Sequence, residues 1–230
     1  MTDTTTIFGW LHEFGADVTA VILSIIIVMG YYLVLRARVR RNPTYSVHYV
    51  NELARKLWVD NVMNNPGKDI MAVQSLRNFI MVGILMVSTS SLLIVGTLTL
   101  SGQAESISRN WHALNVIGSH SAGLWILKVM CLLIDFLVVF FSYAMSIRLA
   151  NHVLFMLNVP KESLAQHEVL SPSHVARRLN KAGHMMAIGL RTLFFAIPLV
   201  FWLFGAVFLL LATVGVVTIV SRLDQHQSGL

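Results

Sequence analysis

The sequence predicts an all-α, polytopic membrane protein with four transmembrane helices and amphipathic cytoplasmic helices, forming a single domain over residues 1–230. The first observation is composition: 56% of the residues are apolar and only 12% are charged, against about 25% charged in soluble proteins. The second is length, because four apolar runs are long enough to cross a hydrocarbon core about 30 Å thick. These runs leave no polar half of the chain that could wrap them as a soluble core.

The four predicted spans cover about residues 18–35, 79–100, 122–147 and 192–220. The last of them is too long for a perpendicular crossing, because its 29 residues would extend about 43 Å at 1.5 Å per residue. It also contains Pro198, which removes one backbone hydrogen bond from a helix. We therefore expect this span to kink just before Pro198, to tilt, or both.

Basic residues predict the orientation. Fourteen lysines and arginines lie in two loops, 36–78 and 148–191, whereas the segments assigned to the other side hold only Arg109 and Arg222. Because short loops rich in Lys and Arg are retained in the cytoplasm, both loops are expected there. The prediction is an inner (cytoplasmic) membrane protein with both termini outside.

Both cytoplasmic loops are expected to contain helices. Apolar residues recur at helical spacing from Val47 to Trp58 with charged residues between them, and this pattern ends in the Asn-Pro-Gly turn signals of 64–67. Asp69 is a plausible cap for a helix that continues into the second span, and Ser173 is a plausible N-cap for one that continues into the fourth.

One candidate site is a path for an ion or solute across the membrane. Asp135 lies near the middle of the third span, with Lys128 two helical turns away on the same face, and an intramembrane carboxylate is by default a functional candidate. The hydroxyl groups of Ser88 and Thr89 lie at similar depth in the second span. The alternatives are that Asp135 and Lys128 bond within the bundle, that Lys128 extends outward to the interface, and that the hydroxyls serve helix packing.

A second candidate is a polar site at the inner mouth of the bundle. Asn180, His184 and Arg191 fall on one face of the expected helix, and Arg77 and Asn78 open the second span at the same level. The alternative is a stripe that faces water or lipid headgroups.

Other sites have less support in the sequence. Three histidines on the outer side, His12, His112 and His120, are weak metal candidates because they lack the close spacing of a ligand set. No phosphate-binding loop, dinucleotide motif or hydrolase motif is present, so no cofactor is expected and an enzyme is the least favoured class. The net charge of +6 does not indicate nucleic-acid binding, because the basic residues flank apolar segments.

Several short motifs resemble the domain-of-unknown-function family 599, a family of small four-span membrane proteins. The resemblance extends from about Arg36 to Asp224 and rests on these segments: Arg41-Asn42-Pro43, Arg55 with Trp58-Val59, 72–78, Ser146-Ile147-Arg148 with Asn151, Asn180 with His184, Gly189 and Arg191, and 198–205. It implies the same topology and implies that Arg77, Asn78, His184 and Arg191 belong to the shared part. It implies no activity.

Two functions therefore compete. The first is a conduit or transporter for a small ion or polar solute, which would need a homo-oligomer because four spans are few for one pore. The second is an accessory or scaffold subunit of a larger membrane complex, packed through small residues such as Gly83, Ser88 and Gly96. In both, the expected partners are the lipid bilayer and other membrane subunits.

Overall fold

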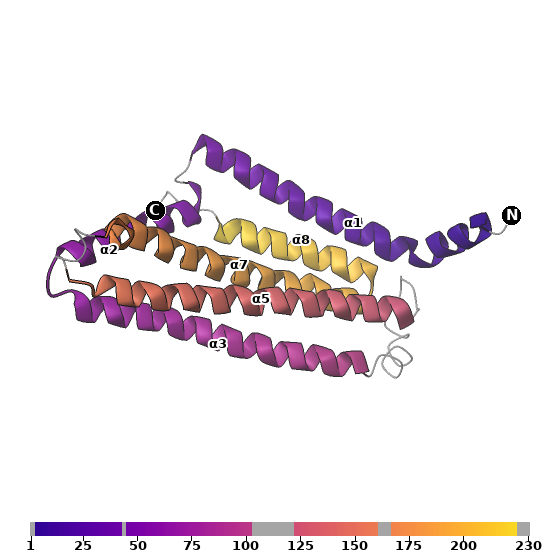
Figure 1. The fold of residues 1–230 in the computed structure, drawn as a ribbon. Helices are drawn as coiled ribbons and strands as arrows, with labels where there is room; N and C mark the ends of the chain where they lie inside the picture. The colour runs from indigo at the N-terminus through magenta and orange to yellow at the C-terminus, as the bar shows by residue number, and fades with distance from the viewer. Residues whose placement is uncertain (1–2, 43–44, 103–121, 161–166, 225–230) are drawn as a thin grey trace.

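The computed structural model describes residues 3–42, 45–102, 122–160 and 167–224, without the side chains of 3–13 and 122. In these ranges the regular structure is helical, which confirms the all-α class (Figure 1). The elements are α1 Asp3–Arg41, α2 Val47–Asn64, α3 Asp69–Gly102, α5 Ala122–Leu157, the short 3-10 helix η2 Glu168–Leu170, α7 Pro172–Phe204 and α8 Ala206–Leu223.

Five of the described helices are long and apolar enough to cross a membrane, not four. The predicted fourth span, 192–220, is two helices, α7 and α8, which are joined at Gly205 and run back along each other (Figure 1). Gly205 has φ 145° and ψ 166°, a conformation that is essentially restricted to glycine. The apolar run continues through this turn, so hydropathy alone does not reveal it. Helix α7 passes through Pro198 and ends only at Phe204.

The long helices form a row in the order α3, α5, α7, α8 and α1 (Figure 1). α5 and α7 have the most extensive contact, α3 packs on the free side of α5, and α8 packs on α7. α1 packs mainly against α8, and α2 lies against α7. Helices α3 and α1 are therefore the two edges of the row.

Along the helix axes, the two ends of the described chain lie at opposite ends of the molecule (Figure 1). The sequence predicts both termini on one side of the membrane; the reversal at Gly205 adds a fifth candidate span, and an odd number of crossings would put them on opposite sides. Asp224 follows α8 and lies beside the start of α2, where its carbonyl oxygen accepts a hydrogen bond of 3.3 Å from the Val47 amide.

At the end of the long helices where α2 lies, α2 and the ends of these helices form a polar layer. α5 has 36 residues and extends about 54 Å, well beyond a 30 Å hydrocarbon core. The predicted amphipathic helix is α2, whose buried face packs into a small core of its own, formed by Val59, Val62, Met63, Ala72, Leu76, Val153, Met156, Leu157, Val175, Ala176 and Leu179. Asp69 is the first residue of α3 and not its cap, and the N-cap of α7 is Ser171 and not Ser173, because Pro172 occupies the first turn of that helix.

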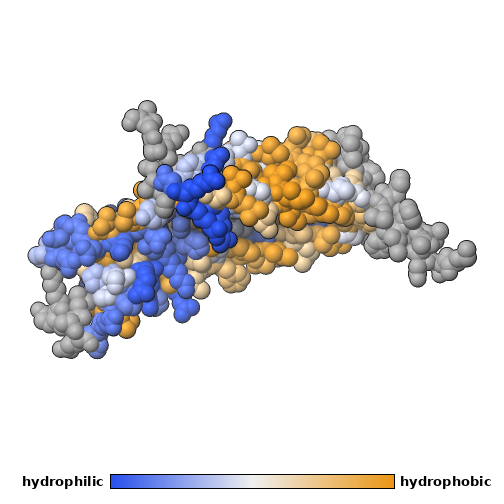
Figure 2. Space-filling view, turned by 90° about the horizontal axis from the view of Figure 1, so that it is seen from above, coloured by the Kyte–Doolittle hydropathy of each residue, from blue (hydrophilic) through white to orange (hydrophobic). Residues whose placement is uncertain are grey.

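The polarity of the surface changes along the axes of the long helices. Hydrophilic residues gather over the end that carries α2, and most of the remaining described surface is hydrophobic (Figure 2). Large apolar side chains such as Leu92, Phe141 and Leu211 are exposed along the spans. So much exposed apolar surface fits a multi-pass membrane protein surrounded by lipid.

Candidate functional site

The first turn of α2 positions one side of the candidate site. Ser46 is the N-cap of α2, and its hydroxyl accepts a hydrogen bond of 3.2 Å from the His48 amide. The His48 ring meets the His184 ring of α7 edge to face, with centroids 5.3 Å apart. The cap of one helix therefore fixes a histidine against the neighbouring helix.

Two turns further along α2, Arg55 lies flat against α7. Its Nε donates a hydrogen bond of 2.7 Å to Oδ1 of Asn180, and Asn180 Nδ2 donates in turn to the Glu52 carbonyl oxygen at 3.3 Å. The guanidinium passes over Gly183, where a Cβ atom would lie only 2.8 Å from Arg55 Cζ. A side chain at position 183 would therefore require the end of the Arg55 side chain to shift.

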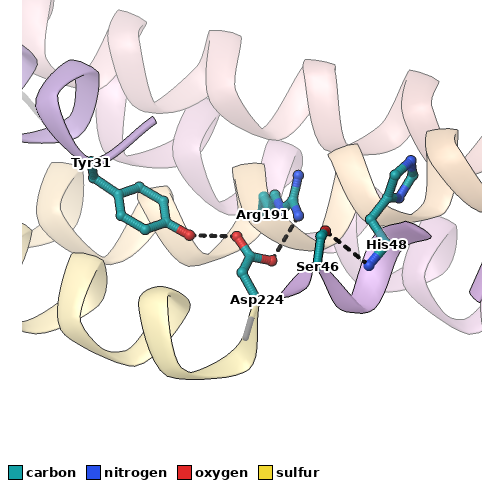
Figure 3. A network of polar contacts seen from close by, with 5 residues as sticks. All are labelled: Tyr31, Ser46, His48, Arg191 and Asp224. Atoms are coloured by element: carbon teal, nitrogen blue, oxygen red, sulfur yellow. Dashed lines mark hydrogen bonds and ion pairs between the residues drawn. The ribbon is translucent and has the colours of Figure 1, made fainter. Parts of the chain in front are cut away.

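Asp224 completes the site and has contacts with four helices. Its carboxylate accepts a hydrogen bond of 2.5 Å from the Tyr31 hydroxyl of α1 and forms an ion pair of 2.7 Å with Arg191 of α7 (Figure 3). Its backbone carbonyl is bonded to Val47 of α2, and Asp224 itself caps α8. This one residue thus joins α1, α2, α7 and α8.

These groups surround a cavity of about 310 Å³, which we call the α2–α7–α8 pocket. Its polar lining is His48, Asn51, Arg55, Arg191 and Asp224, and its apolar lining comes from α7, α8 and Val47 of α2. The only carboxylate of the described lining is already engaged by Arg191 and Tyr31.

The electrostatics of this pocket favour a negatively charged or hydrogen-bond-accepting guest. Burial is the main cause that lowers the pKa of His48 below its usual value of 6.5, and the positive charges of His184, Arg191 and Arg55 act in the same direction. Glu52 acts in the opposite direction with the smallest effect. Burial also lowers the pKa of Arg55, which nevertheless stays cationic because a guanidinium starts at 12.5. The pocket therefore offers two guanidinium groups and an imidazole that is neutral at pH 7.

The predicted inner-mouth residues divide into two groups. Asn180, His184 and Arg191 lie on the face of α7 that meets α2, where Asn180 holds Arg55, His184 packs on His48, and Arg191 lines the pocket. Arg77 and Asn78 are exposed on α3, which packs on the other side of α5.

The residues of the predicted path do not lie together. Lys128 is paired at 2.8 Å with Asp17 of α1 and lies 5.3 Å from the centre of the Trp202 ring. Ser88 and Thr89 are exposed on α3, at the edge of the row. Asp135 is partly buried, and its Oδ2 atom has no hydrogen-bond partner in the part of the chain that the structure describes.

The weak metal candidates lie outside the described side chains. This holds for His12, whose backbone alone is described, and for His112 and His120. Among the described residues, no group of three or more His, Cys, Asp or Glu side chains is arranged to hold a metal ion.

Sequence reasoning missed His48, Arg55, Tyr31, Asp17 and Asp224. Arg55 could have been found, because it belongs to one of the motifs quoted above. Asp17 and Asp224 lie just outside the first and last predicted spans, in the expected terminal tails. Their roles depend on which helices pack together, because Asp17 is bonded to α5 and α7 and Asp224 is bonded to α1, α2 and α7.

Comparison with known proteins agrees with the resemblance found in the sequence. The family model described as protein of unknown function, DUF599, matches residues 19–228. No curated protein and no solved structure shows a significant match. The match covers both sides of the α2–α7–α8 pocket and all five candidate spans except the beginning of α1. The chain is therefore a member of the DUF599 family.

Proposed function

We propose that this protein is an oligomeric membrane transporter or conduit for a small anionic or polar solute, which binds in the α2–α7–α8 pocket. The observation that supports this proposal most strongly is the convergence of Arg55, Arg191 and a neutral His48 on one cavity. That cavity lies between the polar layer and the apolar helices, where a solute leaving water first needs polar partners.

Asp224 supplies a mechanism for coupling. A bound anion and the Asp224 carboxylate would compete for the guanidinium of Arg191, because both use the same donors. When the anion takes these donors, Asp224 loses its ion pair with Arg191 of α7 and keeps its hydrogen bonds to Tyr31 and Val47. Solute binding would thereby loosen one end of the α1–α8 pair.

The predicted path residues fit this function only in an oligomer. Ser88 and Thr89 point away from the row on α3, so they would line a path formed between two copies of the chain. Asp135 remains the candidate for a charged step inside the membrane, because a carboxylate oxygen buried without a partner is costly there. Lys128, which is paired with Asp17, lies on α5 like Asp135, and it would act at the end of α5 that is remote from the pocket.

The test is uptake of potassium salts of several small anions into liposomes that contain the purified protein. Arg191→Gln removes a pocket donor, and Arg222→Gln is the matched control, because Arg222 is exposed on the last turn of α8 and does not line the pocket. We expect Arg191→Gln to lower flux about tenfold or more, the loss expected for one charged hydrogen bond. Equal flux in both variants, or no flux of any anion with the wild type, would contradict the proposal.

The same assay with Asp135→Asn tests whether the Asp135 carboxylate takes part in transport through the membrane. If flux falls while the protein still assembles, the carboxylate takes part in the path. If flux is unchanged, Asp135 is not part of it, and the pocket proposal stands separately on Arg191.

The competing function is an accessory subunit of a larger complex. The observation in its favour is that α1 has substantial contact with α8 alone among the described helices, which leaves most of its surface to lipid or to a partner. Particle mass after mild detergent extraction separates the two functions. A particle with a foreign chain at fixed stoichiometry favours the subunit, and a homo-oligomer favours the transporter.

A further inference from the structure

A second cavity, of about 480 Å³, lies between the end of α5, the short helix η2 and the start of α7. We call it the α5–α7 pocket. Its α7 residues, which include Arg177 and Lys181, are on nearly the opposite side of that helix from Gly183 and Leu190, which line the α2–α7–α8 pocket. The two cavities are therefore separate.

Cations dominate the lining of the α5–α7 pocket. They are Arg148 from α5 and Arg177, Arg178 and Lys181 from α7, with the rings of His152 and His174 beside them. No carboxylate belongs to the described lining. Within the described parts of the chain, the ion pairs are Lys128 with Asp17 and Arg191 with Asp224, so none of these four cations is neutralised by a described carboxylate.

Like charges that share a concave surface repel one another, and an anion placed between them relieves that repulsion. Guanidinium groups are particularly suited to phosphate, because their planar donors can bind two oxygens at once. Three of the four cations here are arginines. The charge, the shape and the residue type all point to a phosphate-bearing ligand.

The position of the pocket along α5 agrees with this ligand. The twelve residues before Arg148 carry no charge, and Arg148 lies about 39 Å along the helix from Ala122. That distance exceeds a hydrocarbon core of about 30 Å, so the pocket opens at the level of the lipid headgroups. Met145 and Leu149 supply an apolar part of the lining, beside which an acyl chain could lie.

We propose that the α5–α7 pocket is a binding site for a phosphate-bearing anion. The phosphate could belong to the headgroup of an anionic lipid or to a soluble compound, because the same donors serve both. This site goes beyond the proposed solute pocket and does not depend on it, since the two share no residue.

The experiment uses the full chain and two double variants of equal charge. Arg177→Gln with Arg178→Gln removes two pocket cations, and Arg40→Gln with Arg41→Gln removes two exposed cations at the end of α1 that do not line the pocket. In one arm, protein extracted from vesicles of phosphatidylcholine, with or without phosphatidylglycerol, is examined by native mass spectrometry for retained lipid. In the other arm, pyrophosphate is titrated calorimetrically in a neutral detergent.

We expect the pocket variant to lose binding at least about tenfold in one of the two arms and the control variant to keep it. Loss of retained phosphatidylglycerol alone identifies a lipid site, and loss of pyrophosphate binding identifies a soluble ligand. Equal binding by the pocket variant and the wild type in both arms, or an equal loss in the control, would overturn the proposal. If the pocket variant does not purify as a helical, monodisperse protein, Arg148→Gln with Lys181→Gln serves the same purpose.

Discussion

Lys128 of α5 and Asp17 of α1 form an ion pair of 2.8 Å in which the two side chains are only 3% and 1% exposed. The indole Nε1 of Trp202 donates a second hydrogen bond of 2.8 Å to the same Asp17 oxygen, and the Lys128 ammonium lies over the Trp202 ring. These contacts tie α1 to α5 and α7, whereas its main packing partner is α8. A buried ion pair therefore links α1 and α5 among apolar helices.

The first prediction concerns this pair. Asp17→Asn and Lys128→Met each leave one buried charge without its partner, and breaking a buried pair in this way costs about 3–5 kcal/mol. Thermal unfolding in detergent should show a clearly lower Tm for each single variant. The double variant, which removes both charges, should be more stable than either single variant.

The contradicting outcome is additivity. If the Tm loss of the double variant equals the sum of the two single losses, the charges do not interact, and the ion pair has no energetic role.

The difference between the expected and the observed partner of Lys128 shows what periodicity can predict. The seven-residue spacing correctly places Lys128 and Asp135 on one helical face, but it gives no information about which helix packs there. Similarly, α2 was predicted from its apolar spacing almost to the residue, because amphipathicity is local. The turn at Gly205 is hidden because the apolar run continues through it, and the pairing of α1 with α8 depends on contacts between distant segments, so no local pattern predicts it.

The second prediction concerns two glycines in helices. Gly183→Ala places a Cβ atom 2.8 Å from Arg55 Cζ, so the arginine must move and its hydrogen bond to Asn180 should weaken. Gly215→Ala is the control, since nothing lies within 4 Å of its new Cβ and alanine favours a helix by up to about 1 kcal/mol. Solute affinity at the α2–α7–α8 pocket should fall for the Gly183 variant alone, and Tm should stay level or rise for the Gly215 variant. A rise in Tm with unchanged affinity for both would show that Arg55 does not need the glycine.

The third prediction concerns topology. If all five candidate helices cross the membrane and the basic loops lie in the cytoplasm, the end after Asp224 is expected inside and the end before α1 outside. Reporter domains fused to each end of the chain and assayed in intact cells should give opposite answers. Two reporters on the same side would mean that α7 and α8 do not both cross the membrane.

The fourth prediction concerns pH. Since the pKa of His48 is below 6.5 in the folded protein, the unfolded chain binds more protons than the folded one in the window from 6.5 down to that lowered value. The free energy of unfolding should therefore fall as the pH drops through this window and be constant above it. His48→Gln should flatten this part of the Tm profile, whereas His184→Gln should retain most of it, because burial is a larger cause of the lowered His48 pKa than the charge of His184. An identical slope in the wild type and His48→Gln would assign the dependence to other groups.

The bond between Tyr31 and Asp224 has a consequence for biosynthesis. The ribosome completes α1 about 180 residues before it completes α8, the helix against which α1 packs. At roughly 5–20 residues per second, the older helix waits about 10–40 s in the bilayer for its neighbour. Translation products that stop before Ala206 would leave α1 without its main packing helix and the Tyr31 hydroxyl without the Asp224 carboxylate, although Asp17 could still pair with Lys128.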